Sequence, residues 1–356
     1  MAIKQKTRVL IVDDSALTRK ILTEILSSDK EIEVIGTAMD PYIAREKIKK
    51  LNPDVLTLDV EMPKMDGISF LKNLMRLRPM PVIMVSSLTQ TGADVALEAL
   101  GLGAIDYVGK PDVSSKSNLS DYASEIISKV KIAASTGQES QSSHTPVNGK
   151  PLPASHKSLK GCKQPIIAVG ASTGGTEAIK ELLFNFQPSS CSLVIVQHIP
   201  KAFSKAFADR VNRSSALEVV EAQDKQEILP GHAYIAPGDQ HLEVIKKNDS
   251  YYCKLNDSEP YNRHKPSVDV LFNSVCTVAG RNAIGVLLTG MGADGARGLK
   301  QMRDTGALTI AQDEQSSIVW GMPGEAVKLQ AADFVLPLNK ITDKLTRLIK
   351  SNTNKQ

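Results

Sequence analysis

Short apolar runs alternate with longer amphipathic stretches in the first third of the chain. Four such runs, most of them rich in β-branched residues, occupy residues 8–12, 54–59, 81–85 and 106–109. The segments between them have a helical pattern. Short buried strands separated by helices are typical of a parallel sheet covered by helices. The pattern therefore predicts an N-terminal α/β domain.

Polar side chains follow each of these runs, at the points where the predicted strands end. They are Asp13 and Asp14, then Asp59, Ser86 and Lys110. Because reactive groups gather beyond the carboxyl ends of parallel strands, we expect these side chains to converge. Clustered carboxylates suit Mg²⁺, and Asp59 could then act as a nucleophile toward phosphorus. Each residue alone also fits a turn, a helix cap or a loop, but the five in this order favour a phosphoacceptor site.

This set of residues resembles the receiver domain of two-component response regulators, over residues 6 to about 132. The resemblance implies a flavodoxin-like fold with a five-stranded parallel sheet. It also implies roles for individual residues: Asp59 as phosphoacceptor, Asp13, Asp14 and Asp59 as Mg²⁺ ligands, and Ser86, Tyr107 and Lys110 as switch residues.

Composition narrows the class of protein. The 356 residues suffice for about two domains of ~150 residues each. The formal net charge is only +4 and basic residues are dispersed, so no nucleic-acid partner is expected. No stretch is long enough to span a membrane, and Asp13-Asp14 interrupt the only candidate signal peptide. The four cysteines are scattered, as expected of reduced thiols in a cytoplasmic protein without direct membrane insertion.

The composition changes between residues 114 and 163, where Ser, Gln, Thr, Lys, Gly and Pro dominate. Such a segment buries too little apolar surface to order itself, which predicts a flexible linker. Only a possible helix near residues 122–134 keeps apolar periodicity. The predicted division is a receiver domain at 1–125, a linker at 126–162 and a catalytic domain at 163–352.

A second α/β pattern follows the linker. Strands are predicted at 165–169, 192–196, 283–288 and 308–311, helices at 176–183, 201–211, 267–278 and 294–305, and a β-rich section at 233–255. A further helix is predicted near the C-terminus. This alternation predicts a mostly parallel, doubly wound α/β domain.

The first strand of this second domain runs into Gly170-Ala-Ser172-Thr-Gly-Gly175 and then into a helix. A glycine-rich turn of this kind can bind phosphate or can expose a nucleophilic serine. The dinucleotide-binding spacing and the P-loop lysine are both absent. Ser172 is therefore a candidate nucleophile, with the alternative that it caps the helix.

Two further strand ends favour the nucleophile. His198 follows the second strand, and Asp294 lies in a glycine-rich turn after the strand at 283–288. Asp294 could also be a helix cap. Together with Ser172 they would form a nucleophile, a base and an orienting acid. The chain order Ser, His, Asp differs from the Ser, Asp, His of α/β-hydrolases, so only the serine turn resembles that fold.

Four motifs in order resemble the chemotaxis-specific protein-glutamate methylesterase family, whose members also act as protein-glutamine glutaminases. They are residues 170–175, Gln197-His-Ile-Pro200, residues 262–269 and residues 289–295, after a receiver and a linker. The segment 257–261 departs from the Gly-Pro-rich approach expected there, and Lys265 stands where Arg is common. The departure bears only on a local substrate-facing loop.

The resemblance implies phosphorylation-activated demethylation of glutamate methyl esters, and deamidation of selected glutamines, on methyl-accepting chemotaxis receptors. The products are glutamate and methanol or ammonia, in sensory adaptation of bacterial chemotaxis. A chemotaxis histidine kinase would be the phosphodonor, and the catalytic domain would need no cofactor. Ser172, His198 and Asp294 would form the triad, with the backbone of Thr173 and Met291 as oxyanion or substrate candidates.

Three points stay open from the sequence. A DNA-binding output domain and an inactive nucleotide-binding domain are the rival interpretations of the second domain. Arg263, His264 and Asp269 fit a substrate groove or a local salt bridge and helix cap equally well. The simplest hypothesis for regulation is that the unphosphorylated receiver covers the mouth of the catalytic site.

Overall fold

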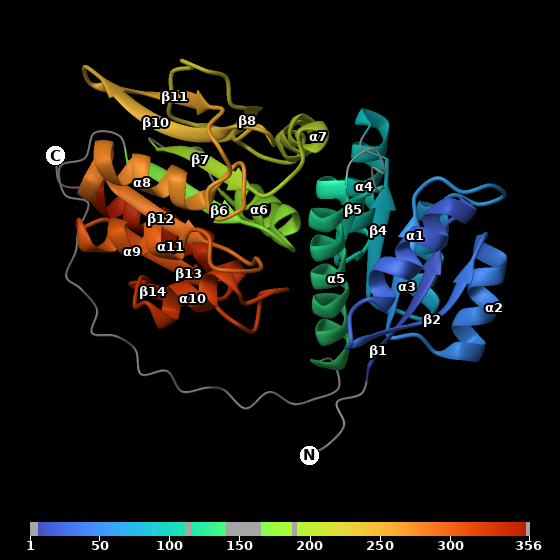
Figure 1. Cartoon of the computed structure of the whole chain (residues 1–356). Coiled ribbons are helices and arrows are strands. Elements are labelled where there is room, and N and C mark those ends of the chain that lie inside the picture. Colours follow the sequence, from blue (N-terminus) through green and yellow to red (C-terminus); the bar gives the residue numbers. More distant parts are fainter. Residues whose placement is uncertain (1–5, 88, 111–115, 140–164, 187–190, 354–356) are drawn as a thin grey trace. The chain divides into compact units, whose positions relative to one another are not determined.

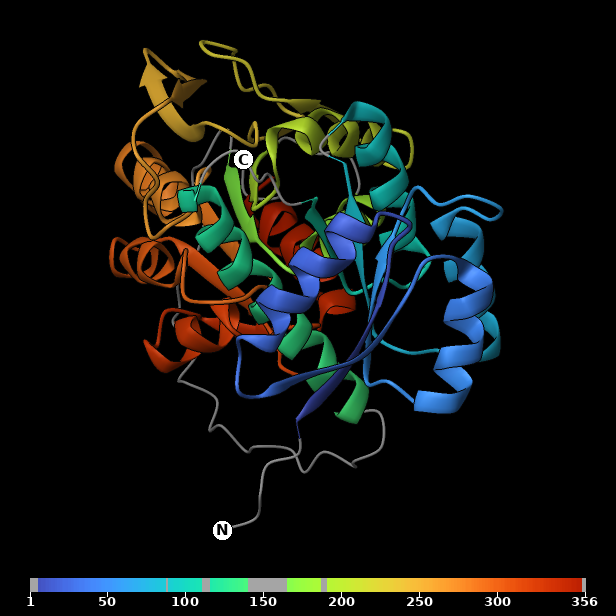
Figure 2. The same ribbon diagram turned by 45° about the vertical axis from the view of Figure 1, so that its right-hand side comes forward.

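The structure, a computed structural model, describes residues 6–87, 89–110, 116–139, 165–186 and 191–353. The chain divides into two compact units, residues 1–148 and 149–356 (Figures 1 and 2). Within the part of the chain that is described, no helix combines the length and the apolar character needed to cross a membrane.

The first unit contains a five-stranded parallel sheet in the order β2-β1-β3-β4-β5. Its strands are β1 Thr7–Val12, β2 Ile32–Ala38, β3 Val55–Asp59, β4 Val82–Ser86 and β5 Asp106–Gly109. Its helices are α1 Ala16–Ser27, α2 Pro41–Leu51, α3 Gly67–Leu77, α4 Gln90–Gly101 and α5 Lys116–Glu139. The predicted five-stranded parallel sheet is confirmed.

Alternating residues of the central strands face the two sides of this sheet. Val9 and Ile11 of β1 pack in one core cluster with buried residues of α1 and α5, such as Leu22 and Ile126. Leu10 and Val12 point to the opposite face of the sheet and are also buried. A strand buried on both faces has to be continuously apolar, which is why β1 and β3 were visible in the sequence.

Helix α5 extends through residues that the sequence analysis assigned to the linker. That linker was predicted to begin at residue 126, but α5 continues to Glu139. Val130 and Ala133 are fully buried in the same core cluster as Ile126. The possible helix predicted near residues 122–134 is therefore part of α5, which continues to Glu139 inside the predicted linker. The remainder of the predicted linker, including His144 and His156, lies outside the described residues.

The second unit contains a seven-stranded sheet in the order β14-β13-β12-β6-β7-β9-β8, and all its strand pairs are parallel (Figure 1). The strands are β6 Ile166–Ala171, β7 Ser192–Gln197, β8 Glu218–Glu221, β9 His232–Ile235, β12 Ala283–Leu287, β13 Leu308–Gln312 and β14 Phe334–Leu336. Two further strands, β10 His241–Lys247 and β11 Ser250–Asn256, pair as an antiparallel hairpin.

Helices cover both faces of the seven-stranded sheet, as predicted for a doubly wound domain. They are α6 Gly175–Phe184, α7 Lys201–Asn212, α8 Val268–Ala279, α9 Ala296–Asp304, α10 Met322–Lys328 and α11 Leu338–Thr353, with a short 3₁₀ turn at Gly280–Asn282. Buried residues of α8, α9 and α10 share one core cluster with β6 and β7. Helix α11 packs on α6, where the Thr342 hydroxyl donates to the Leu182 carbonyl at 3.1 Å.

The order of the strands reverses beside β6. The chain passes from β6 to β7 on one side, whereas β12, β13 and β14 continue on the other side. Helix α6 after β6 and helix α9 after β12 therefore belong to different layers. Open α/β sheets bind their ligands at such a switch point, beyond the carboxyl ends of the strands. The segments after β6 and β12 meet there.

Candidate catalytic and phosphoacceptor sites

The structure brings the three predicted acidic residues of the first unit together. One carboxylate oxygen from each of Asp13, Asp14 and Asp59 lies within 4.8 Å of the others. Asp13 and Asp14 follow β1 and Asp59 ends β3, and these two strands are neighbours in register. The convergence expected from the strand ends is therefore present.

Lys110 pairs with this cluster. Its Nζ lies 2.8 Å from Oδ2 of Asp59, which is fully buried. Burial raises the pKa of the Asp59 carboxyl group, and the hydrogen bond from Lys110 partly offsets that effect. Burial opposes the charge of Lys110 too, but its hydrogen bond to Asp59 and the nearby carboxylates raise its pKa overall. The ammonium group thus compensates only part of the negative charge of the cluster.

Asp13 has the strongest signature of a cation site. Its Oδ1 accepts a hydrogen bond from the Ser15 amide at 2.8 Å, whereas its buried Oδ2 has no hydrogen-bond partner among the described residues. Burial and the adjacent Asp59 raise the pKa of Asp13 to about 6. A buried carboxylate oxygen without a donor is costly. Mg²⁺ prefers oxygen ligands, so the residues present fit this cation.

The two remaining switch candidates are both buried. The Ser86 hydroxyl at the end of β4 donates to the Gly92 carbonyl at 3.1 Å. Tyr107 on β5 is 4% exposed, and burial raises the pKa of its phenol well above the usual value. Lys129 on α5 also contacts Tyr107, which was not predicted from the sequence. Its Nζ lies 5.3 Å from the Tyr107 ring centroid and 2.6 Å from the Tyr107 carbonyl oxygen.

In the second unit, Ser172 lies in the sharp turn between β6 and α6. Its amide donates to the Thr289 carbonyl at 3.0 Å, and its own carbonyl accepts from the Gly175 amide at 2.7 Å. The N-cap of α6 is Gly174, which has a φ of +76° and no side-chain cap bond. The structure therefore does not support the alternative in which Ser172 caps the helix. Left-handed backbone at Gly174 is readily adopted only by glycine.

Gln197 and Gly290 hold the backbone of this turn from two sides. The Gln197 Nε2 donates to the Ser172 carbonyl at 2.9 Å and to the His198 carbonyl at 3.1 Å. A Cβ on Gly290 would lie 2.7 Å from the Ser172 Cβ. Real side chains essentially never approach so closely, so glycine at 290 permits the segment after β12 to pack directly on Ser172.

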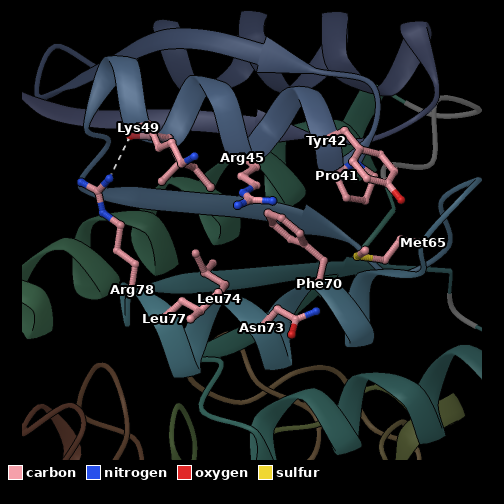
Figure 3. Close-up of a pocket in the computed structure, with 11 residues that line it drawn as sticks. Pro41, Tyr42, Arg45, Lys49, Met65, Phe70, Asn73, Leu74, Leu77 and Arg78 are labelled. Carbon is pink, nitrogen blue, oxygen red and sulfur yellow. Dashed lines mark hydrogen bonds between the residues drawn. The ribbon is translucent and has the colours of Figure 1, made fainter.

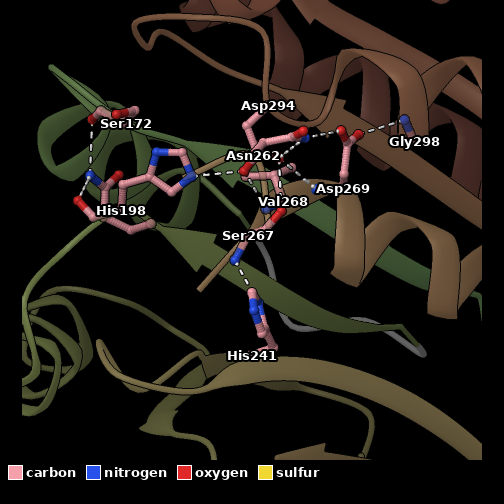
Figure 4. A network of polar contacts seen from close by, with 10 residues as sticks. Ser172, His198, His241, Asn262, Ser267, Val268, Asp269, Asp294 and Gly298 are labelled. Carbon is pink, nitrogen blue, oxygen red and sulfur yellow. Dashed lines mark hydrogen bonds and ion pairs between the residues drawn. The ribbon is translucent and has the colours of Figure 1, made fainter. Parts of the chain in front are cut away.

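His198 follows β7, the neighbour of β6, and lies beside the Ser172 turn. Its Nε2 lies 2.9 Å from Oδ2 of Asp294. Its Nδ1 is buried and has no hydrogen-bond partner within the described residues. Figure 4 shows the imidazole between Ser172 and Asp294. The ring therefore has one nitrogen committed to the carboxylate and one available to a hydroxyl or a substrate.

Asp294 accepts hydrogen bonds from several directions and is only 3% exposed. The Ser267 hydroxyl donates to Oδ1 at 2.8 Å, and the Val268 amide donates to Oδ2 at 2.7 Å (Figure 4). Burial opposes ionisation, but the bonds from His198, Val268 and Ser267 outweigh it and hold the pKa of Asp294 well below its ordinary value. Because the N-cap of α9 is Gly295, Asp294 is not the cap of this helix, and its carboxylate instead contacts His198 and the segment before α8.

The two oxyanion candidates, Thr173 and Met291, follow Ser172 and Gly290 in the turns after β6 and β12. Thr173 is buried, and its carbonyl accepts a hydrogen bond from the Thr289 hydroxyl at 3.0 Å. Met291 is 36% exposed and follows Gly290 in the turn after β12. Their backbone amides stay candidates for the oxyanion site.

A shell of residues around Asp294 was only partly predicted. Asn262, His264 and Asp269 lie in a motif that the sequence analysis singled out, without a definite role. No sequence pattern indicated a role for His241, because tertiary structure alone brings it to the site. It is fully buried, and its Nδ1 accepts from the Ser267 amide at 3.1 Å while its Nε2 lies 3.1 Å from the Glu259 carbonyl oxygen. His241 thus fixes the segment that binds Asp294.

A groove elsewhere on the first unit contains none of the predicted site residues. It lies between α2 and α3 and has a volume of about 490 Å³ (Figure 3). Its lining includes the aromatic side chains of Tyr42 and Phe70 and the basic side chains of Arg45 and Arg78. None of the five phosphoacceptor-site residues lines this groove.

Fold and site together define a class of protein: a receiver-like phosphoacceptor unit joined to an α/β unit with a Ser turn and a His–Asp pair at its switch point. Comparisons with known proteins agree with this class. A family model described as a response regulator receiver domain matches residues 9–120, and one described as CheB methylesterase matches residues 167–345.

Close relatives extend over nearly the whole chain. A protein-glutamate methylesterase/protein-glutamine glutaminase of Hydrogenovibrio crunogenus is 53% identical over 373 residues, covering 97% of this chain and 99% of the relative. A second protein of that name from Saccharophagus degradans is 56% identical and covers 94% and 96%. The crystal structure of the Thermotoga maritima CheB methylesterase catalytic domain, 36% identical, matches with a TM-score of 0.51, covering 52% of this chain and 99% of that domain. The chain belongs to the CheB methylesterase family, in the form that carries an N-terminal receiver domain.

Proposed function

We propose that this protein is a phosphorylation-activated protein-glutamate methylesterase and protein-glutamine glutaminase that acts on methyl-accepting chemotaxis receptors. The observation that carries the proposal is the His198–Asp294 pair, 2.9 Å apart, beside the Ser172 turn. Membership of the family and the names of relatives that span nearly the whole chain support the substrate class.

Ser172 would be the nucleophile toward the γ-carbonyl of a methylated glutamate. His198 Nδ1, the nitrogen without a partner among the described residues, would accept the hydroxyl proton as the Ser172 Oγ–carbon bond forms. The same nitrogen would return the proton to the departing methoxide, which leaves as methanol. Water would then attack the acyl-enzyme by the reverse sequence, giving glutamate and free Ser172.

Asp294 would fix the tautomer of His198. A carboxylate at Nε2 requires that this nitrogen carry the hydrogen, and this leaves the lone pair of Nδ1 free to act as a base. The low pKa of Asp294 keeps the carboxylate charged, so it can also stabilise the imidazolium that forms during the reaction. The backbone amides of Thr173 and Met291 are the proposed donors to the developing oxyanion.

A glutamine side chain would react at the same groups. The leaving group would then be ammonia, protonated by His198 in place of methoxide. Both reactions need a nucleophile, a base and an oxyanion site, and neither needs a cofactor in this domain.

The receiver would control this activity through Asp59. Asp13, Asp14 and Asp59 would hold Mg²⁺, which would offset the charge of the carboxylates and of an incoming phosphoryl group. Asp59 would accept the phosphoryl group from a chemotaxis histidine kinase, Lys110 would pair with it, and the Ser86 hydroxyl would exchange Gly92 for a phosphate oxygen. The unphosphorylated receiver would inhibit the catalytic domain.

Release of methanol and ammonia from receptor membranes tests the esterase and the glutaminase. Methylated receptors would be the substrate for methanol release, and receptors that carry glutamine at the same sites would be the substrate for ammonia release. Wild type should release both products, and Ser172→Ala should lower both rates by about 10³-fold or more. Full turnover in Ser172→Ala would end the assignment of the nucleophile. No release from wild type would end the proposed function.

A further inference from the structure

The peptide that joins Ser172 to Thr173 is anchored by its carbonyl group. This carbonyl accepts a hydrogen bond from the Gly175 amide at 2.7 Å and another from the Gln197 Nε2 at 2.9 Å. The peptide is trans, and in a trans peptide the carbonyl and the N–H point in opposite directions. The N–H of Thr173 therefore points away from the Gln197 amide, and its direction stays fixed while the carbonyl is bound.

The Gln197 side chain, at the end of β7, is itself held firmly. It is 4% exposed, and its Nε2 also donates to the His198 carbonyl at 3.1 Å. Because both of these partners are acceptors, they define which end of the amide carries the hydrogens. A Cβ on Gly175 would lie 2.1 Å from the Gln197 Oε1, so helix α6 begins directly against this amide. Gln197 is thus a buried, closely packed donor to the Ser172 turn.

Thr289, which follows β12, binds the next peptide along the chain. Its hydroxyl oxygen lies 3.0 Å from the Thr173 carbonyl oxygen and 3.2 Å from the Val319 carbonyl oxygen. The Val319 carbonyl already accepts from the Gly290 amide at 3.0 Å, so we assign the single hydroxyl hydrogen to Thr173. The hydroxyl oxygen in turn accepts from the Val319 amide at 2.9 Å.

The backbone of Thr289 is fixed on both sides as well. Its amide donates to the Gln312 Oε1 at 2.8 Å, and its carbonyl accepts from the Ser172 amide at 3.0 Å. Gln312 is fully buried at the end of β13, and its Nε2 donates to the Ser316 carbonyl at 2.7 Å. Thr289 is 1% exposed. Its hydroxyl therefore reaches the Ser172 turn from a rigid position on the opposite side from Gln197.

We infer that Gln197 and Thr289 are positioning residues, which hold the two peptides that flank Thr173 and so direct its N–H toward the developing oxyanion. This inference rests on the proposed function, since it concerns the oxyanion donor of the same reaction. Both side chains act through the backbone of Thr173. The hydrogen bonds to the Ser172 carbonyl also polarise that peptide, which makes its N–H a stronger donor.

Orientation matters here because an oxyanion donor stabilises charge only where the charge develops. Loss of one such donor lowers kcat by about 10²–10³-fold in a serine hydrolase. A donor that is present but turned away should cost part of that factor. The fall should appear in kcat more than in KM, because the ground-state carbonyl carries little of the charge.

The test uses variants of the full-length protein that remove one hydrogen bond each. Gln197→Met keeps the length of the side chain without the donor. Thr289→Val keeps the shape without the hydroxyl, and Thr289→Ser keeps the hydroxyl. Thr309→Val is the matched control, since Thr309 is a fully buried residue of β13 whose hydroxyl contacts Asp333 outside the catalytic site.

Two rates are measured: labelling of Ser172 by a serine-directed phosphonate, and methanol release with kcat and KM separated. We expect Gln197→Met and Thr289→Val each to lower kcat and the labelling rate about 10–10²-fold, with KM within about twofold. Thr289→Ser should stay within about threefold of wild type, and Thr309→Val should equal wild type. The double variant should be at most about threefold slower than the slower single variant, because both losses misdirect the same N–H.

Two results would overturn the inference. One is a double variant whose loss equals the product of the single losses, since the two side chains would then act independently. The other is a Thr289→Ser variant as slow as Thr289→Val, which would make the loss one of packing.

The pH profile of kcat/KM separates the oxyanion donor from the base. Gln197 also binds the His198 carbonyl, but the His198–Asp294 pair is untouched in both variants, so the apparent pKa of the profile should stay at its wild-type value. A shift of this pKa in Gln197→Met would overturn the role of Gln197, because it would then act through His198. If wild type labels at Ser172 but releases no methanol, the substrate assignment fails, and the labelling rates of the variants still decide the roles of Gln197 and Thr289.

Discussion

His198 meets Asp294 through Nε2 at 2.9 Å, so only Nδ1 remains for the serine side of the site. In the serine proteases that define the triad, the two nitrogens have the opposite assignment: Nδ1 meets the aspartate and Nε2 the serine. His198 reaches the site from the end of β7, whereas Asp294 lies beyond β12, on the far side of β6.

Replacement of Asp294 by Asn should nearly abolish activity while keeping the shape of the side chain. An amide that presents its N–H to His198 would stabilise the tautomer with hydrogen on Nδ1, which cannot accept the Ser172 proton. We expect kcat to fall by about 10³–10⁴-fold with little change in KM. Steady-state methanol release measures this effect. Activity within about threefold of wild type would show that Asp294 does not fix the tautomer.

The pH dependence of stability provides a second test of Asp294. Its pKa lies below the ordinary value of 3.8, so its bonds stabilise the folded state fully above pH 3.8, and this stabilisation is lost as the pH falls below 3.8. Asp294→Ala should cost about 3 kcal/mol at pH 7, because buried donors lose their acceptor. The difference from wild type should shrink progressively below pH 3.8.

Urea unfolding followed by tryptophan fluorescence measures this difference, since Trp320 is the only tryptophan and lies in the second unit. Asp304→Ala is the matched control. Asp304 forms an exposed ion pair with Lys300, so its replacement should change stability by less than about 1 kcal/mol. A difference between Asp294→Ala and wild type that does not vary with pH would contradict the low pKa.

A methyl group at residue 290 should damage the site sterically. A Cβ on Gly290 would lie 2.3 Å from Met322 Sδ and 2.7 Å from Ser172 Cβ, so the Ser172 turn would have to move. We expect Gly290→Ala to lower kcat about 10²-fold or more. Gly231→Ala is the control: its φ is +76°, but nothing lies within 4 Å of the added carbon. It should cost about 1 kcal/mol of stability without loss of kcat.

Asp13→Asn should make the receiver more stable in the absence of Mg²⁺ and at the same time lower its phosphorylation. The folded pKa of Asp13 is about 6 against an ordinary 3.8, so without Mg²⁺ the folded state binds more protons than the unfolded state between these values. Wild-type stability therefore falls as the pH rises from 3.8 to about 6. Asp13→Asn removes this loss and should unfold at a higher temperature above pH 6 in EDTA.

Calorimetry in EDTA measures that stabilisation, and mass spectrometry after treatment with acetyl phosphate and Mg²⁺ measures aspartyl phosphate. The variant should form little phosphate, because a metal ligand is lost. A variant that is more stable and is also phosphorylated normally would remove Asp13 from the proposed metal site.

The central strands of both sheets could be predicted from the sequence, and so could the buried edge strand β5, whereas the edge strands β2 and β8 could not. β1, β3, β6 and β12 are buried on both faces and read as apolar runs. β2 and β8 are edge strands, and most of their residues are only half-buried or exposed. Without a continuous apolar run they resemble loops. In α5, apolar periodicity indicated a possible helix near residues 122–134, whereas its start at Lys116 and its last turn, to Glu139, were not predicted.

The site residues that directly follow strands could be predicted from the sequence. Ser172, His198 and Asp294 each follow a strand, and parallel strands bring such residues together. The contacts that distinguish a catalytic acid from a helix cap were not predictable. Ser267 donates to Asp294 from just before α8, and His241 of the β10–β11 hairpin accepts from the Ser267 amide, so both contacts depend on how these elements pack. The stack of His264 on His198 likewise depends on a turn with unusual backbone.

Methanol release from methylated receptor membranes, measured for wild type and Asp59→Asn with and without acetyl phosphate and Mg²⁺, shows whether phosphorylation of the receiver controls the esterase. We expect the phosphodonor to raise the wild-type rate about 5–150-fold and to leave Asp59→Asn at the basal rate. Equal rates in wild type with and without the phosphodonor, under conditions where Asp59 is phosphorylated, would contradict control of the esterase by the receiver.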